Sequence, residues 1–239
     1  MDSAVRTVFA RAQTLAGAAL FFLAVAVLLP PDCMAGEPAM VLRVEGSRLY
    51  VDGGAGPESR RQVALPGRIT AVAVSGPGQA TVIAAATMAP YALHLFDQRL
   101  VPLQTLRLTD RAGKQESPVC AIHVAESRQS FVVVFSAISE LWEVSYNPTA
   151  PEIGLGMVHD FQYREGHFVP GYLNPLRSAL PFLPAQSALS GDGHAVLLRA
   201  PAAAGQTLAL PSVELPLDVR KLIGAASENP TRWSDCSRF

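Results

Sequence analysis

The side chains best suited to chemistry are concentrated in one stretch, from Ser139 to Leu180. His159 stands out in it, because a neutral imidazole binds iron and exchanges protons near neutral pH. Asp160 and Glu165 follow closely and supply acceptors that could orient the ring. We therefore treat His159 as a candidate catalytic group and a candidate iron ligand.

Neighbouring residues of this stretch could bind the rest of a cofactor. Arg164 and Arg177 carry planar guanidinium groups, which bind carboxylates through paired hydrogen bonds. Tyr172 could form one wall of a flat aromatic pocket, together with Tyr163 and Phe168. A structural interpretation stands beside each of these, since loop histidines are commonly hydrogen-bonded structure and loop arginines are usually solvated.

Several classes of site are excluded by spacing. The sequence contains no C-x-x-C-H motif for covalent haem, no zinc-ligand spacing, no Ser-His-Asp set and no glycine-rich phosphate loop. The 19 basic and 20 acidic residues give a net charge of −1, which offers no basic surface to nucleic acid. We therefore expect no nucleic-acid partner.

Short apolar strands must position the candidate residues. After the first forty residues, runs of Val, Ile and Leu are interrupted by Gly, Pro, Asp and Asn, which is the pattern of strands and turns. The chain is therefore expected to be all-β. The predicted strands cover 40–46, 48–53, 69–75, 80–87, 91–97, 103–109, 119–125, 130–137 and 141–147.

A repeated unit organises these strands. AVAVSGPGQATVIA, from Ala71, and AIHVAESRQSFVVV, from Ala121, are offset by fifty residues, and SALSGDGHAVLLR, from Ser187, is a third copy. Four strands in every 40–50 residues or so is typical of a propeller blade. We predict a partial β-propeller of about four blades, and a β-sandwich with evenly spaced hairpins is the alternative.

The third copy follows the second at a longer interval than the second follows the first. The excess falls at 148–183, inside the stretch that holds the candidate residues. We predict an insertion at a connection between two blades, near the central channel. Loops held by a rigid scaffold are where function concentrates.

The first 35 residues have the features of a secretory signal. Arg6 and Arg11 precede an apolar run over 15–29, and small residues lead to an expected cleavage after Ala35. This pattern predicts a periplasmic protein. An uncleaved anchor is the alternative, and only then do we expect contact with a membrane.

Blade structure is expected over 36–225 and an irregular tail over 226–239. Cys120 and Cys236 could pair in an oxidising periplasm, or Cys120 could face a core while Cys236 stays unpaired in the tail.

About 200 residues suit one domain and about four blades, whereas closed propellers usually have more blades. We therefore favour a piece of a longer protein over a small closed propeller or association with another copy.

Three segments resemble the cytochrome cd1 haem-domain family. They are ELWEVSYNPTAPE, GLGMVHDFQYREGHFVPGYLNPLRSALP and LPLDVRKLIGA. The likeness covers about 139–225 and is weaker over 40–138. This family includes the cytochrome cd1 nitrite reductases and periplasmic haem d1 biosynthesis proteins, whose eight-bladed propeller holds haem d1 over its channel. The resemblance implies a partial propeller of that type.

The resemblance also assigns roles to the candidate residues. His159 matches the family's His-Asp position beside the macrocycle, which implies proton donation or hydrogen bonding to a bound anion, or ligation of iron. Arg164 and Arg177 become candidates for the carboxylates of haem d1. The implied function is tetrapyrrole binding for nitrite reduction or haem d1 assembly. If the chain is active, it is an oxidoreductase of the nitrite reductase or haem d1 biosynthesis type.

Departures from the family pattern leave a second function open. The sequence has no cytochrome c domain and no recognisable blades after LPLDVRK. Electrons would then come from a periplasmic electron-transfer protein, and another copy of the chain could complete the ring. The alternative function is a non-catalytic propeller fragment that binds another protein through an exposed apolar edge.

Overall fold

The computed structural model describes residues 40–52, 60–76, 80–157, 166–201, 212–216 and 233–236. These residues form β-strands and one three-residue 3-10 turn, Glu126–Arg128. The all-β prediction is confirmed. In this part of the chain there is no helix with the length and hydropathy needed to cross a membrane.

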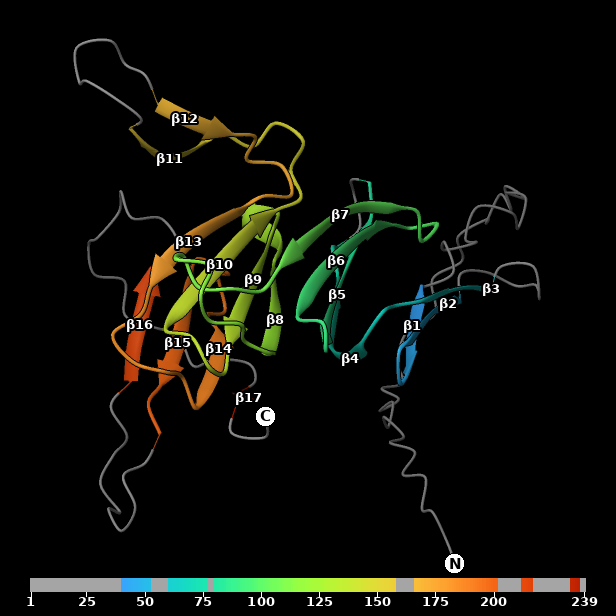
Figure 1. Cartoon of the computed structure of the whole chain (residues 1–239), viewed down its shortest axis with the longest axis horizontal. Coiled ribbons are helices and arrows are strands. Elements are labelled where there is room, and N and C mark those ends of the chain that lie inside the picture. The colour runs from blue at the N-terminus through green and yellow to red at the C-terminus, as the bar shows by residue number, and fades with distance from the viewer. Residues whose placement is uncertain are drawn as a thin grey trace, which may run out of the picture. The chain divides into compact units, whose positions relative to one another are not determined.

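Four antiparallel sheets make up the body of the structure, and we number them blades 1 to 4 (Figure 1). Blade 1 contains β1 (Val41–Glu45), β2 (Arg48–Asp52) and β3 (Arg60–Ala64). Blade 2 contains β4 (Arg68–Val74), β5 (Val82–Met88), β6 (Ala92–Asp97) and β7 (Pro102–Arg107). Blade 3 contains β8 (Val119–Ala125), β9 (Ser130–Phe135), β10 (Glu140–Ser145) and β13 (Pro175–Ala179). Blade 4 contains β14 (Gln186–Leu189), β15 (Ala195–Arg199), β16 (Ser212–Pro216) and β17 (Ser234–Asp235).

Strand order within the blades is that of a propeller. Blades 2 and 3 run in sequence order from a first strand to an outer fourth strand. The first strands of neighbouring blades, β4 with β8 and β8 with β14, contact one another on the inner side of the propeller. The three repeats found in the sequence are the hairpins β4–β5, β8–β9 and β14–β15. The propeller prediction is therefore confirmed as a partial β-propeller.

Blades 1 to 3 stack through strand β5, which is buried on both faces. Val82, Ala84 and Ala86 pack in the apolar cluster shared with blade 3. Ile83 and Ala85 alternate with them and pack against blade 1. Because neither face meets water, the strand is a continuous apolar run and lacks polar alternation.

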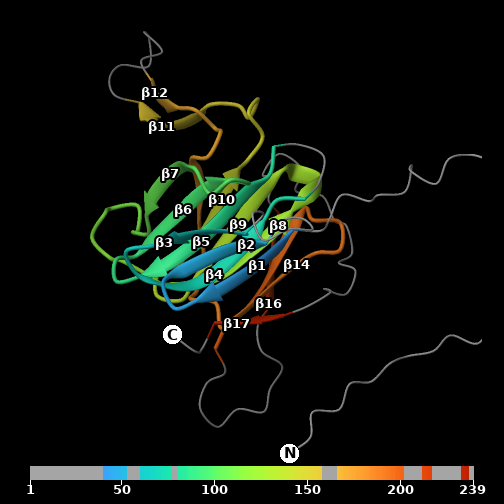
Figure 2. The same ribbon diagram turned by 90° about the vertical axis from the view of Figure 1, so that its right-hand side faces the viewer.

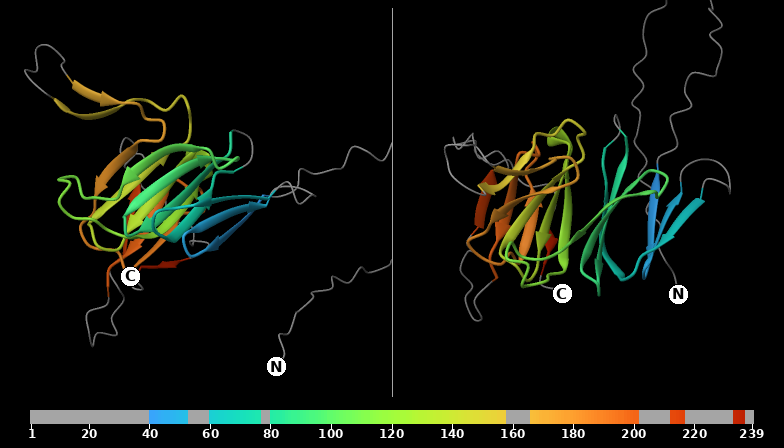
Figure 3. Two further views of the ribbon diagram at one scale, coloured as in Figure 1. Left: turned by 45° about the vertical axis from the view of Figure 1, so that its right-hand side comes forward. Right: turned by 45° about the horizontal axis from the view of Figure 1, so that its top comes forward.

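Strand β9 repeats this arrangement between blades 2 and 4. Phe131, Val133 and Phe135 face blade 2, and Val132 and Val134 face blade 4. The right-hand view of Figure 3 shows the sheets packed face to face, and Figure 2 looks onto their faces. The core is therefore a series of three clusters between neighbouring blades.

The outward face of blade 1 carries mainly charged side chains, together with one exposed apolar residue, Val41. Tyr50 lies between two guanidinium groups, with Arg43 Cζ 4.6 Å and Arg60 Cζ 5.1 Å from its ring centre. Arg43 also pairs with Glu45 at 3.0 Å, and Arg60 with Asp52 at 3.6 Å. Cation–π contacts and ion pairs therefore occupy a face on which a further blade would require apolar residues.

The insertion lies inside blade 3, before its outer strand, which corrects the predicted connection between two blades near the central channel. Its hairpin, β11 (Ile153–Met157) and β12 (Gly166–Val169), follows the third strand, β10, and precedes the fourth, β13. Figures 1 and 2 show this hairpin extending beyond the end of the blade. The insertion was misplaced because β13, with the sequence PLRSA and partial exposure, lacks an apolar strand pattern.

The C-terminal segment contains ordered structure at 233–236. Strand β17 pairs antiparallel with β14, through Ser187 with Ser234 and Gln186 with Asp235. Cys236 forms a disulfide with Cys120, a pairing that the sequence left open. The predicted irregular tail, 226–239, thus includes a short strand in the residues that the structure describes.

Candidate functional site

A cavity of about 630 Å³ opens between the outer strands of blades 2 and 3 and the hairpin β11–β12. Its volume lies in the range of small-molecule sites, about 300–1,000 Å³. The apolar part of its wall comes from Leu106, Ile153, Leu155, Val169, Pro175 and Leu176. Its polar part comes mainly from Arg107, Thr109, Asp110, Arg111, Asn174 and Arg177.

Arg177 is held rigidly in this wall. Its guanidinium carbon lies 4.3 Å from the ring centre of Trp142. Its Nη1 donates to the carbonyl of Thr109 at 3.2 Å and lies 3.9 Å from Oε2 of Glu140. Nε and Nη2 have no acceptor among the described residues, so they remain available to a ligand in the cavity.

Glu140 connects two lining residues of the cavity, Arg111 and Trp142. Its Oε1 accepts the backbone N–H of Arg111 at 2.7 Å, and its Oε2 accepts Nε1 of Trp142 at 3.3 Å. Burial lowers the pKa of Arg177, and the charge of Glu140 opposes this effect. The arrangement presents a partly desolvated cation beside apolar walls, which suits an apolar molecule with a carboxylate.

Among the predicted site residues that the structure describes, Arg177 lies in the cavity wall and Tyr172 does not. Tyr172 packs against the cluster between blades 2 and 3, and its backbone forms a bridge to Ser145. His159 and Arg164 belong to 158–165, which connects β11 to β12 and lies outside the described residues. The structure therefore brings Arg177 close to the hairpin whose connection contains His159 and Arg164, and packs Tyr172 against the cluster between blades 2 and 3.

The sequence analysis missed the residues that fix Arg177. Glu140 and Trp142 are two positions apart on β10, so they share one face of the sheet. The register of the blade pairs Trp142 with Arg177 directly. The two-residue spacing was visible in the sequence, whereas the cross-strand register depends on the unpredicted strand β13.

The described part of the wall fits the carboxylates and ring of a tetrapyrrole better than its iron. None of the described lining residues is a His, Cys or Met. The described residues also contain no cluster of three metal-ligating side chains. Two histidines have hydroxyl neighbours instead: the buried His94 lies between Thr87 and Thr105, and the partly buried His123 contacts Ser187. An iron ligand would have to come from outside this set, and His159 is the predicted candidate.

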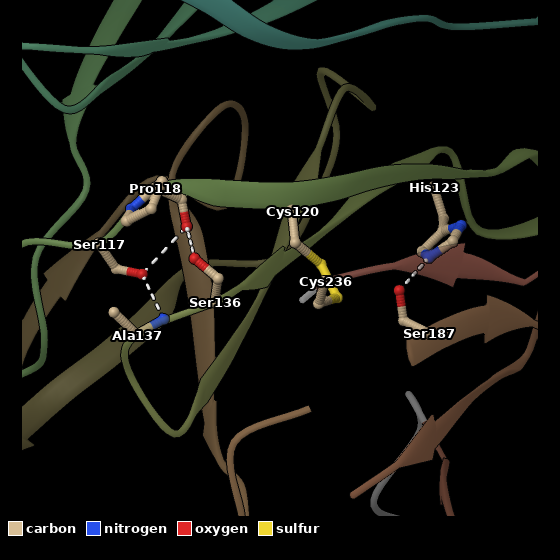
Figure 4. The surroundings of a disulfide bond; sticks show 8 residues. All are labelled: Ser117, Pro118, Cys120, His123, Ser136, Ala137, Ser187 and Cys236. Carbon is tan, nitrogen blue, oxygen red and sulfur yellow. Dashed lines mark hydrogen bonds between the residues drawn. A yellow bond between two sulfur atoms is a disulfide. The ribbon is translucent and has the colours of Figure 1, made fainter. Parts of the chain in front are cut away.

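His123 makes the stability of the fold sensitive to acid. Its Nε2 lies 2.9 Å from Oγ of Ser187 across blades 3 and 4, as Figure 4 shows. Burial lowers the pKa of His123 from 6.5 to about 4. The unfolded chain therefore binds a proton at a higher pH than the folded chain does, so acid favours unfolding.

We expect the free energy of unfolding to fall by about 3 kcal/mol from this residue as the pH drops from 6.5 to 4. Denaturant unfolding at several pH values would measure the slope. His123→Gln keeps a hydrogen-bonding group opposite Ser187 and should reduce the dependence of the unfolding free energy on pH. His94, whose pKa is also lowered by burial, is present in both proteins and contributes equally to them. An unchanged slope in the variant would show that His123 is not the responsible group.

Comparison with known proteins adds a structural likeness. No protein-family model and no curated protein matches the chain. Among solved structures, dihydro-heme d1 dehydrogenase NirN in complex with DHE is similar, with 21% sequence identity and a TM-score of 0.54. The likeness covers 79% of this chain and 34% of NirN, so the chain spans about a third of that protein. At this identity the likeness shows the fold, a β-propeller.

Proposed function

We propose that the chain is a periplasmic propeller protein related to the haem d1 proteins, binding a tetrapyrrole for nitrite reduction or haem d1 assembly. Two observations outside the site support this. The sequence segments around His159 resemble the cytochrome cd1 haem-domain family. The fold resembles that of NirN, a dehydrogenase of dihydro-haem d1 solved in complex with DHE.

The observation that carries the proposal is the cavity beside the insertion. Tetrapyrroles are flat apolar rings with carboxylate side chains, and the cavity combines apolar walls with the available donors of Arg177. In the proposed complex Nε and Nη2 of Arg177 bind one carboxylate, while Leu155 and Leu176 contact the ring. His159 and Arg164 lie outside the described residues; in this proposal His159 would bind the iron or a bound anion, and Arg164 would bind a second carboxylate.

When bound, haem d1 would supply the redox chemistry, and the protein would orient it and exclude water. The Trp142 ring and Glu140 hold the guanidinium of Arg177 before the ligand arrives, which reduces the entropy lost on binding. A proton delivered from His159 would be the chain's own contribution to chemistry. An external periplasmic electron-transfer protein would supply electrons.

The disulfide supports the proposed compartment. Disulfides persist in oxidising environments such as the bacterial periplasm. Cys120 and Cys236 are paired, and residues 1–35 have the pattern of a secretory signal. We therefore propose the periplasm as the location of the protein.

An absorption titration with haem d1 tests the proposal. We expect a saturable spectrum at one equivalent, with a shift of the bands in His159→Ala because the iron loses a ligand or its close neighbour. Circular dichroism of both proteins provides the control for folding. A folded protein that shows no saturable change would contradict tetrapyrrole binding.

The alternative is a non-catalytic propeller that binds another protein. Exposed apolar residues on the hairpin favour it: Phe168 is 56% exposed and Leu155 51%. Exposed apolar groups of this size commonly mark interaction sites. The charged outward face of blade 1 argues against an interface there, so the hairpin side would be the contact surface.

A further inference from the structure

We propose that the Cys120–Cys236 disulfide is a thiol-operated latch, which holds the C-terminal strand β17 on the inner edge of blade 4. In blades 2 and 3 the inner edge is the first strand itself, β4 or β8. In blade 4 the order is β16-β15-β14-β17, so a strand from the far end of the chain covers the first strand. The same strand also contacts β8 of blade 3.

Strand β17 contains only two residues, Ser234 and Asp235. It pairs with β14 at two positions, and the backbone N–H of Cys236 donates to the carbonyl of Ala185 at 2.8 Å. Arg199 adds a cation–π contact, with Cζ 3.8 Å from the ring centre of Trp233. A strand this short is not expected to stay bound without a covalent tie. The disulfide supplies that tie, across a sequence separation of 116.

A β-bulge aims Cys120 at the C-terminal strand. The pairing of β8 with β9 shifts between Val119 and Ala121, so Cys120 is the extra residue without a cross-strand partner. The same shift occurs between Ile69 and Ala71 in blade 2, which leaves Thr70 at the position fifty residues earlier. Bulges redirect side chains. The repeat therefore carries the bulge, and in blade 3 the bulged residue is a cysteine.

Access to the bond favours attack at Cys120. Figure 4 shows the bond between the two sulfur atoms. Cys236 is 4% exposed and packs in the cluster between blades 3 and 4, whereas Cys120 is partly exposed. A thiolate of a dithiol reductant attacks Sγ of Cys120, the S–S bond breaks, and Cys236 leaves as a thiolate that takes a proton from water. The second thiol of the reductant then displaces Cys120, which is protonated in turn. Two electrons pass to the latch, and the reductant becomes a disulfide.

Opening the latch uncovers the inner edge of β14. The backbone groups at Gln186 and Ser187 that pair with β17 become available, while blade 2 keeps its own inner strand. An uncovered strand edge accepts extended polypeptide, so the redox state would control whether blade 4 can pair with a further strand. This device works whether or not the chain binds a tetrapyrrole.

Hydrogen–deuterium exchange on the full chain, with and without dithiothreitol, tests the latch. Amides at 185–187 and 234–236 should exchange on the order of tenfold faster after reduction, and those of β4 to β7 should not change. The Cys120→Ser/Cys236→Ser variant should exchange like the reduced protein and should not respond to the reagent, although it retains Cys33.

Two results would overturn the latch. Unchanged exchange at 185–187 after complete reduction would mean that β17 stays bound without the disulfide. Faster exchange throughout blade 2 as well would mean that the bond maintains the whole fold and does not control one edge. Because reduction is performed on folded wild-type protein, a failure of the double variant to fold does not remove the test.

Discussion

Replacing Arg128 by Ala lowers the free energy of unfolding by about 3–5 kcal/mol. Arg128 donates from Nε and Nη2 to the two carboxylate oxygens of Glu143, at 2.8 and 3.1 Å. Glu143 is 9% exposed, and Ser130 is its other donor, at 2.8 Å. The substitution leaves a buried carboxylate with a hydroxyl in place of a cation, which is why the expected loss is large.

Urea unfolding followed by circular dichroism measures this loss, and a matched surface pair provides the control. Nη2 of Arg107 lies 3.0 Å from Oε1 of Glu116, a distance similar to those between Arg128 and Glu143, but the side chain of Arg107 is 79% exposed. We therefore expect Arg107→Ala to change the free energy of unfolding by less than about 1 kcal/mol. The double variant Arg128→Ala/Glu143→Ala should be more stable than the two single losses predict when added. Equal, small effects of Arg128→Ala and Arg107→Ala would contradict the buried pair.

Replacing Trp142 by Ala has a comparable effect, again about 3–5 kcal/mol. The side chain is fully buried between blades 2 and 3 and meets Phe135 edge-on, with ring centres 5.0 Å apart. Its ring also forms the cation–π contact with the guanidinium of Arg177. The variant should therefore lose both packing between blades and the fixed orientation of the guanidinium.

Trp142→Phe separates these two roles. Phenylalanine keeps most of the apolar contact with Phe135 but removes the N–H that donates to Glu140. We expect about 1–2 kcal/mol of destabilisation from it, clearly less than from Trp142→Ala. Thermal or denaturant unfolding gives both values. A loss below about 1 kcal/mol for Trp142→Ala would show that this cluster does not hold the blades together.

Strands buried on both faces could be predicted from the sequence. β5 and β9 are continuous apolar runs because each packs between two neighbouring blades. The recurrence of their hairpins at an offset of fifty residues followed from the repeated turn and strand, and led to the propeller. Local pattern was sufficient here, since burial on two faces leaves an unbroken signal.

Strands defined by distant partners could not be predicted in this way. β3, with the sequence RRQVA, and β13, with PLRSA, lie at exposed positions and lack apolar alternation. β17 is a two-residue strand that depends on Cys120, which lies far away in the sequence. Their places are set by pairing and by a cross-link, which a local pattern does not contain.

The site residues show the same difference between what a local pattern predicts and what strand pairing determines. Arg177 was predicted from its guanidinium chemistry and does line the cavity. Tyr172 was predicted from its aromatic type, but it is partly buried against the cluster between blades 2 and 3 and is not among the described lining residues of the cavity. Glu140 and Trp142 were missed as site residues because their roles follow from the register between β10 and β13.

The affinity of haem d1 for wild-type, Arg177→Gln and Arg43→Gln proteins is the most direct test of the account. Arg43 stacks on Tyr50 as Arg177 stacks on Trp142, but it lies on blade 1, away from the cavity. We predict binding that weakens on the order of tenfold or more in Arg177→Gln, because a charged hydrogen bond to a carboxylate is lost, and that is unchanged in Arg43→Gln. Equal affinities for all three folded proteins would contradict a tetrapyrrole site at this cavity.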